Sequence, residues 1–192
     1  MKKQKRNRRG NHWVPLITVW TFILAIVLGF IARIILSAIY SLAVSFLILA
    51  MVILLGIVFD MIGTAAAAAD PAPLNAKAAR KVDGARRGVY LVQHADQVAN
   101  FCNDVVGDIS GIVSGTLAAI IVMRLITAWP YRQAELYAGI IFTALVAAIT
   151  VGGKAWGKTL AISHSTEVIL LVGKILNRLE KAFFWLAPKK RR

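Results

Sequence analysis

The stretch Asn100-Phe-Cys-Asn-Asp-Val-Val-Gly-Asp-Ile-Ser-Gly-Ile-Val-Ser-Gly115 decides how this chain is built. Its first half is polar and carries two carboxylates, and its second half leads into a long apolar run. On a helix, residues three or four apart share a face, so the small and polar residues of the stretch form one stripe. Carboxylates at the mouth of an apolar helix are costly in a bilayer unless they face protein, water or a cation. The stripe consists of Asn100, Asp104, Asp108, Gly111 and Gly115, with Gly107 beside it.

The composition around this stretch is that of a membrane protein. The chain has 192 residues, 58% of them hydrophobic, and a formal charge of +14. Its mean hydropathy is +0.68, which excludes an ordinary soluble domain. The cations stand in blocks outside the apolar segments and accompany no nucleic-acid motif, so we expect a lipid bilayer, and no nucleic acid, as the partner. Cys102 is the single cysteine, which excludes an internal disulfide.

The apolar segments predict an all-α integral membrane protein with four transmembrane helices. The first two share the run from Trp13 to Ile62, which contains only two charged residues, Arg33 and Asp60. This run is about twice the ~20 residues that one span needs, so we expect two antiparallel helices with a turn between Arg33 and Ser37. The predicted spans are residues 14–32, 40–58, 105–123 and 136–151.

The segments between and after the spans predict shorter helices at the membrane surface. Asp70-Pro-Ala-Pro73 prevents a continuous helix, and Val82-Asp-Gly84 marks a stop and restart, so residues 70–98 form a juxtamembrane helical connection. Asp96 is the expected N-cap of the helix that follows. After Gly152-Gly153 the chain turns polar and then amphipathic, which predicts a C-terminal interfacial helix. The expected units are residues 1–12 (basic N-terminus), 13–36 (additional N-terminal span), 37–162 (transmembrane domain) and 163–192 (interfacial helix and basic tail).

The distribution of Lys and Arg predicts the topology. Twenty of the 23 cations lie in three blocks: the N-terminus, the connection between the second and third spans, and the C-terminal part. Because loops rich in Lys and Arg stay in the cytoplasm, we expect a multi-pass protein of the cell's inner membrane with both termini and the connection cytoplasmic, in contact with anionic lipid head groups. The remaining cations are Arg33, Arg124 and Arg132.

Asp104 and Asp108 are candidates for a cation site. Two carboxylates one helical turn apart repel each other and need a bound cation, a basic partner or a shared proton. Asp60, at the end of an apolar span, has Thr64 one turn later on its face. A hard divalent cation such as Mg²⁺ takes oxygen ligands. The candidate ligands are Asp60, Thr64, Asn103, Asp104, Asp108 and Ser110.

Other interpretations of these residues are compatible with the same spacing. Asp104 and Asp108 can instead sit in the headgroup layer and pair with Lys154 or with juxtamembrane arginines. Lys154 can also snorkel to the surface. The ladder of Gly107, Gly111 and Gly115 permits close helix packing, and packing alone is its favoured role.

No feature predicts an enzyme. A Ser-His-Asp or Cys-His constellation is missing from the sequence. Residues 152–159 match the phosphate-loop pattern by letter, but they follow a membrane helix where that motif needs a strand.

The order of parts resembles the transmembrane domain of the CNNM/CorC (CorB) magnesium transporter family. That family has a span ending in a Ser-Gly-Ser-Glu-like turn, a span with an early Gly-Asn, and a span ending in Gly-Glu-x-x-Pro-Lys-(Ser/Thr)-Leu-Ala. The corresponding positions here read Ile62-Gly-Thr-Ala65, Gly107-Asp108 and Gly153-Lys-Ala-Trp-Gly-Lys-Thr-Leu-Ala161. The resemblance covers about residues 40–186. It implies a homodimer that moves or binds a divalent cation, with Mg²⁺ first and other divalent cations or Na⁺ open, through a polar pocket between the second, third and fourth spans.

The departures from the family pattern leave a second function open. The family's two glutamates fall on Ala65 and Lys154, its asparagine on Asp108 and its proline on Gly157. Two acidic positions are thus lost and one is gained. We also expect no regulation through the CBS domains that usually follow in the family. The alternative is a non-transporting scaffold, or a lipid- or partner-binding membrane protein, that has lost the ion site.

Overall fold

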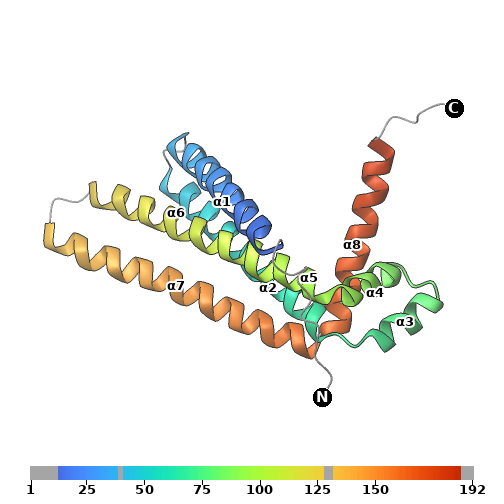
Figure 1. Ribbon diagram of the computed structural model, residues 1–192. Coiled ribbons are helices and arrows are strands. Elements are labelled where there is room, and N and C mark those ends of the chain that lie inside the picture. Colours follow the sequence, from blue (N-terminus) through green and yellow to red (C-terminus); the bar gives the residue numbers. More distant parts are fainter. Residues whose placement is uncertain (1–12, 39–40, 128–131, 187–192) are drawn as a thin grey trace, which may run out of the picture.

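The computed structural model describes residues 13–38, 41–127 and 132–186. Within these residues every regular element is a helix. Figure 1 shows α2, α6 and α7 running side by side as a bundle, with α1 on one flank and α3, α4 and α8 gathered at one end. The elements are α1 (Trp13–Ala38), α2 (Leu42–Ala68), α3 (Pro71–Ala79), α4 (Ala85–Gln93), α5 (Ala95–Ala99), the π-helix η2 (Asn100–Val106), α6 (Gly107–Thr127), α7 (Arg132–Ser163) and α8 (Ser165–Leu186).

Three helical stretches in the described residues are long and apolar enough to cross a membrane. They are Leu42–Ala68, Ala95–Leu125 and Tyr137–Ser163. The apolar stretch found in α1, Thr18–Ile31, is shorter than these. The all-α membrane architecture is therefore confirmed, while the fourth span and the side on which the termini lie stay predictions.

Three helices run further than the sequence pattern predicts. The run from Trp13 to Ile62 does hold two helices, but α1 includes Arg33–Ser37, so the predicted position of the turn is wrong, because neither an arginine nor a serine breaks a helix. α2 extends beyond residue 58 through the alanine run to Ala68, and alanine is the strongest helix former. α7 continues through Gly152-Gly153, where we expected a polar break. Gly153 is held by tight packing against α2, which offsets the low helix propensity of glycine.

The juxtamembrane connection breaks where its sequence predicts. α3 begins at Pro71, and the Asp70 carboxylate caps it by accepting a hydrogen bond from the Ala72 amide at 2.9 Å. Gly84, with a φ of 79°, separates α3 from α4. The prediction that Asp96 caps the next helix is wrong: the N-cap is His94, and Asp96 lies inside the first turn of α5, where its charge still favours the helix dipole.

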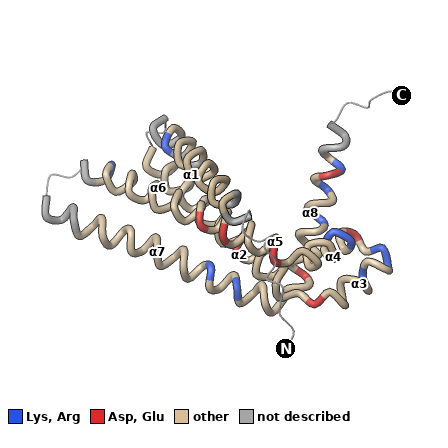
Figure 2. The backbone as a smooth tube through the Cα atoms, viewed as in Figure 1, with Lys and Arg blue, Asp and Glu red and all other residues tan. Residues whose placement is uncertain are grey.

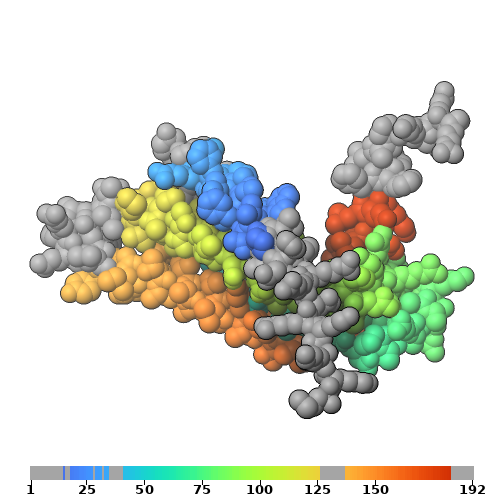
Figure 3. Space-filling model, viewed as in Figure 1, coloured from blue at the N-terminus to red at the C-terminus, as the bar shows by residue number. Residues whose placement is uncertain are grey.

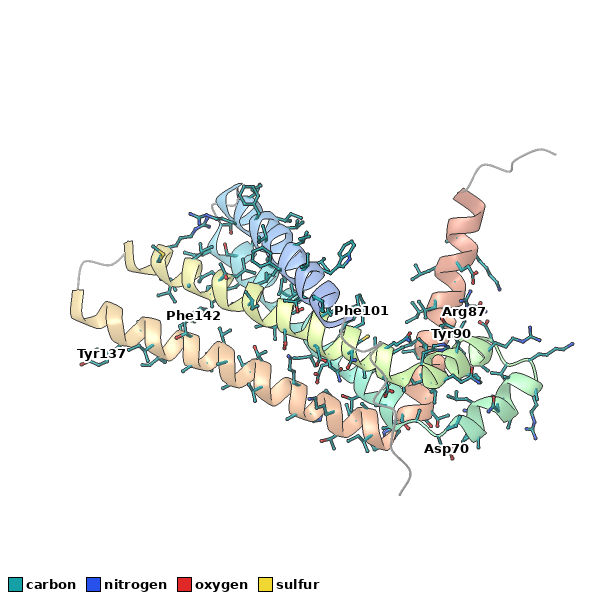
Figure 4. The ribbon with its side chains drawn as sticks, in the orientation of Figure 1. Asp70, Arg87, Tyr90, Phe101, Tyr137 and Phe142 are labelled. Atoms are coloured by element: carbon teal, nitrogen blue, oxygen red, sulfur yellow. The ribbon has the colours of Figure 1, made fainter. Side chains whose placement is uncertain are left out.

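The main core holds the bundle together. Its buried residues come from α2, α6 and α7 and include Leu49, Ile53, Leu117, Ile121 and Val146. Phe142 of α7 packs against this core, and its ring contacts the ring of Phe46 of α2 edge to face, with centroids 5.6 Å apart. Figure 4 labels Phe142. These contacts fix α6 and α7 against α2, so side chains at the ends of the three helices have defined neighbours.

A second cluster sits at the end of the bundle that carries the juxtamembrane helices. It joins the end of α2 to α3, the end of α7 and the start of α8, and it is built from Ala65, Ala66, Ala69, Leu74, Ala161 and Ile169. The small alanine side chains let α7 and α8 approach the end of α2 closely. Figure 3 shows the red surface of α8 adjoining the green surface of α3 and α4 at this end of the molecule.

α8 crosses the direction of the bundle and packs on α4 (Figure 1). Its backbone approaches that of α4 at Gly173, where an added Cβ would lie 3.1 Å from the Gly88 nitrogen. Asn177 donates a hydrogen bond to Asp83 at 2.8 Å, and Arg87 pairs with Glu180. Beside this contact lies an apolar cavity of about 450 Å³, lined by α8 residues such as Ile175 and Leu179 and by Tyr90 and Phe101 (Figure 4).

Candidate cation site

Asp60 is the most buried carboxylate among the described residues. It lies on α2 within a stretch long enough to cross a membrane and is only 3% exposed. Its Oδ2 accepts no hydrogen bond from the described part of the chain, and the Lys158 Nζ lies 3.6 Å from that oxygen. Thr64, which the sequence places beside it, donates its hydroxyl to the Asp60 backbone carbonyl at 2.8 Å. The Thr64 hydroxyl is therefore hydrogen-bonded to the backbone of its own helix.

Asn103 is the second polar residue at this level, and η2 directs it against α2. A Cβ added at Gly63 would lie 2.8 Å from the Asn103 Cγ and would clash with Oδ1, so the asparagine fits there because residue 63 is glycine. The Asn103 Oδ1 is buried and accepts no hydrogen bond from the described residues. Isolated π-helical turns inside helices are frequent at functional sites because they change the direction of one side chain.

Ser110 of α6 contacts the same face of α2 at Gly56, two turns before Gly63. It is 7% exposed, and a Cβ added at Gly56 would lie 2.9 Å from the Ser110 Cβ. Its hydroxyl donates to the Val106 carbonyl at 2.7 Å. Gly56, Asp60 and Gly63 lie four and three residues apart and therefore share one face of α2. The two close approaches place Asp60 between them, against the antiparallel helix formed by η2 and α6.

Two lysines one turn apart on α7 reach this contact. The Lys154 Nζ donates to the Gly107 carbonyl at 3.3 Å, and Lys158 is the partner of Asp60. α7 comes close enough because Gly157 packs on Ile57 of α2, 3.4 Å from where a Cβ would be. We call the contact among α2, η2–α6 and α7 the polar seam, and its residues are Asp60, Asn103, Ser110, Lys154 and Lys158.

Asp104 and Asp108 lie outside the polar seam. Both are exposed, and the predicted stripe from Asn100 to Gly115 faces away from the other helices over most of its length. Figure 2 shows red segments, which mark Asp and Glu, along the helix beside α2. In the described residues, neither carboxylate pairs with Lys154, and no three His, Cys, Asp or Glu side chains gather into a group that could hold a metal ion. The six predicted ligands are thus divided between two faces.

The glycines that bring helices together are different from the predicted ladder. A Cβ at Gly111 or Gly115 would meet nothing within 4 Å, so this part of the ladder packs on no described helix. Gly107 instead leaves room for the Lys154 ammonium, 3.5 Å from where its Cβ would be. The tight contacts come from Gly56, Gly63 and Gly153, which the sequence analysis did not select. Helical spacing around Asp60 is the signal that would have identified the first two.

The polar seam offers oxygen atoms that suit a hard cation. It brings a carboxylate, an amide oxygen, a hydroxyl oxygen and a backbone carbonyl to one contact between helices. A carboxylate buried in a membrane-spanning helix needs a cationic partner, and here either an ammonium or a metal ion meets that need.

Comparison with known proteins identifies a family. A family model described as the cyclin M transmembrane N-terminal domain (CNNM) matches residues 46–188. The match begins in α2 and continues past α8, and it leaves α1 outside. No curated protein and no solved structure matches the chain.

Proposed function

Because this chain belongs to the family of cyclin M (CNNM) transmembrane N-terminal domains, we propose that it binds and moves a divalent cation, Mg²⁺, through the polar seam. The family is one associated with divalent cation transport. One observation carries the proposal. Asp60 and Asn103 each have a buried oxygen that receives no hydrogen bond from the part of the chain that the structure describes, and both lie on the contact between α2 and η2.

The ligand chemistry of this contact fits Mg²⁺. Mg²⁺ prefers oxygen ligands, keeps several of its waters and is usually held by only one or two carboxylates. Asp60 supplies the charge, and the Asn103 amide oxygen is oriented toward the same face of α2 by the Gly63 contact. Ser110 and the Gly107 carbonyl are the next oxygens along α6. Asp60 and Asn103 are therefore the ligands that we propose, and the exposed Asp104 and Asp108 are not part of this site.

The movement step follows from the close packing of small residues. Gly56, Gly63 and Gly153 let the backbones of neighbouring helices approach without interlocked side chains. Helices packed in this way can shift by small translations, which would expose the seam first to one side of the membrane and then to the other.

A metal-dependent thermal shift tests binding. Ligands that bind only the folded state raise its apparent stability, so Mg²⁺ should raise the Tm of the detergent-purified chain. Comparison with Mn²⁺, Ca²⁺ and Na⁺ identifies the preferred ion. Asp60→Asn should remove the shift, whereas Asp104→Asn, which removes the same charge from an exposed position, should retain it. A Tm that responds to none of these ions would contradict the proposal.

A scaffold without transport is the second candidate, and the lysines favour it. Lys158 already forms an ion pair with Asp60, and Lys154 already donates a hydrogen bond to the Gly107 carbonyl. Under this candidate the seam is a structural ion pair. Asp60→Asn would then lower the Tm equally with and without metal, and a second change, Lys158→Met, would restore it.

A further inference from the structure

The two α7 lysines point their ammonium groups at oxygens that a cation would use. The Lys158 Nζ is 3.6 Å from the Asp60 Oδ2, and the Lys154 Nζ is 3.3 Å from the Gly107 carbonyl oxygen. Gly107 follows η2 directly, one turn after Asn103. We propose that Lys154 and Lys158 are the resident cations of the polar seam and compete with the metal ion for its oxygen ligands. This inference rests on the proposed function and names what limits metal binding at that site.

The position of Lys154 argues against simple snorkelling. A lysine that snorkels extends its stem along apolar surface and leaves its ammonium in water. Lys154 is partly buried, and its ammonium instead donates to a carbonyl of a neighbouring membrane-spanning helix. Glycine at position 107 leaves the room for it, since a Cβ there would lie 3.5 Å from the Nζ. This ammonium is therefore seated in the contact between two helices.

Lys158 differs from Lys154 in how readily it can leave. Its side chain is 50% exposed, whereas that of Asp60 is 5% exposed. An incoming divalent ion can replace Lys158 at the carboxylate while the ammonium swings toward the open side of α7. We therefore assign Lys158 as the displaceable competitor and Lys154 as the fixed charge that lowers the affinity of the whole seam.

If the lysines compete with the metal ion, removal of either charge should lower the Kd for Mg²⁺. An ammonium within a few ångströms of a bound metal ion repels it, so removal of that charge strengthens metal binding, by at least about tenfold at the effective dielectric of a partly buried site. Methionine keeps an unbranched apolar stem of similar length without the charge. In the full-length chain, Mg²⁺ titrations should give Kd values at least about tenfold lower for Lys158→Met and Lys154→Met than for the parent. Lys77→Met on α3, outside the seam, should bind as the parent does.

Stability without metal provides a second measurement. Lys158→Met leaves the Asp60 carboxylate without its cation, so its metal-free Tm should fall, and Mg²⁺ should raise that Tm more than it raises the parent's. Asp60→Asn added to Lys158→Met should restore the metal-free Tm and abolish the response to Mg²⁺. A metal-free Tm equal to the parent's in Lys158→Met would overturn the assignment of Lys158.

The outcomes separate this inference from the transport proposal. If the parent binds Mg²⁺ and neither lysine variant binds it more tightly, the inference is wrong and the proposed function stands. If the parent does not bind Mg²⁺ and the lysine variants do, the inference holds and the parent chain is the non-transporting scaffold. If neither the parent nor the variants bind, both are wrong.

Discussion

Asp60 and Asn103 are unusual because each has a buried side-chain oxygen that accepts no hydrogen bond from the described residues. An unsatisfied buried acceptor costs about 1–3 kcal/mol, so two on one helix contact indicate a use. Lys158, 3.6 Å from Asp60, offsets part of this cost. The same three side chains are therefore the ones on which our proposals for stability and for cation binding both depend.

Gly63→Ala tests whether the protein needs the close contact between Asn103 and Gly63. The new Cβ would lie 2.8 Å from the Asn103 Cγ and overlap Oδ1, so either Asn103 or α2 must move. We expect a loss of unfolding free energy of about 1–3 kcal/mol, which is typical of overpacking, together with weaker Mg²⁺ binding. Denaturant unfolding of the detergent-purified protein measures the first effect.

Gly111→Ala is the matched control, because a Cβ there meets nothing within 4 Å. It adds the same methyl group to the same kind of backbone, and we expect it to retain the stability of the parent or gain slightly. Equal losses for the two variants would show that Asn103 does not occupy a tight seat against Gly63.

The sequence identifies part of this site and misses part of it. Asp60 stands out as an acid in an apolar run, and Asn103 and Ser110 stand out as polar residues at the start of the next span. Lys158 carries no such signal, because the family pattern has a lysine at its position, whereas Lys154 stands where the family has an acid. The division between Asn103 and its neighbour Asp104 follows from η2, and a π-turn arises from packing between helices and leaves no periodic signal in the sequence.

At the scale of elements, small residues decide how close the helices approach. α7 contacts α2 through Gly153 and Gly157, and α8 contacts α4 through Gly173. The sequence pattern indicated breaks at Gly152-Gly153, yet α7 is continuous there. Helix ends could be predicted where proline or a positive φ enforces them, as at Pro71 and Gly84, and could not where packing overrides propensity.

Gly153→Leu should therefore separate α7 from α2. A Cβ at this position would lie 3.2 Å from the Ile57 Cγ1 and would overlap its Cδ1, and leucine adds three further carbons. We expect the Tm to fall and the Lys158 contact with Asp60 to be lost. Gly152→Leu makes the same change one residue earlier, where a Cβ meets nothing within 4 Å, and should be tolerated. If Gly153→Leu and Gly152→Leu have the same Tm, α7 does not pack on α2 through the face that carries Gly153.

Asp83 reports the docking of α8 by its titration. The hydrogen bond from Asn177 lowers the pKa of the Asp83 carboxyl below its ordinary value of 3.8, and the positive charge of Lys181 adds to this. The contact therefore contributes to stability at neutral pH, and that contribution is lost as the pH falls through the lowered pKa. In a carboxyl-carbon NMR titration, Asn177→Ala should move the Asp83 midpoint upward. Asn75→Ala, on exposed α3 surface, should leave it in place, and an unmoved midpoint in Asn177→Ala would contradict the contact.

At the scale of the whole molecule, charge and shape indicate one orientation. α3, α4 and α8 gather at one end of the bundle, and most of the blue Lys and Arg segments in Figure 2 lie there. From the positive-inside rule we predict that this end lies in the cytoplasm, with α8 along the membrane surface. The outward face of Asp104, Asp108, Gly111 and Gly115 carries no described helix, and it is the face that the predicted homodimer would cover.

Cysteine labelling tests the orientation. Arg86→Cys on exposed α4 should react with an impermeant thiol reagent only after the cells are permeabilised. Ser41→Cys, exposed at the other end of α2, should react in intact cells. Background should be low because the native Cys102 is 6% exposed. Labelling of Arg86→Cys in intact cells would reverse the proposed topology.

The family and the all-helical membrane class could be predicted from this sequence, because apolar length, charge blocks and turn motifs are properties of the chain itself. The residues that form the seam depend on which helix faces meet, and that information appears only with the fold. The outward position of Asp104 and Asp108 illustrates this, since their spacing of one helical turn made them candidates for the same cation site as Asp60.

Mg²⁺ uptake into proteoliposomes tests the central claim most directly, because it asks whether an ion crosses the membrane through the seam. The parent protein should carry Mg²⁺ to an enclosed fluorescent indicator down an imposed gradient. Asp60→Asn should reduce uptake to the level of empty vesicles, whereas Asp104→Asn should support uptake like the parent. Uptake by Asp60→Asn at the parent's rate, from protein shown to be folded and equally reconstituted, would contradict the account.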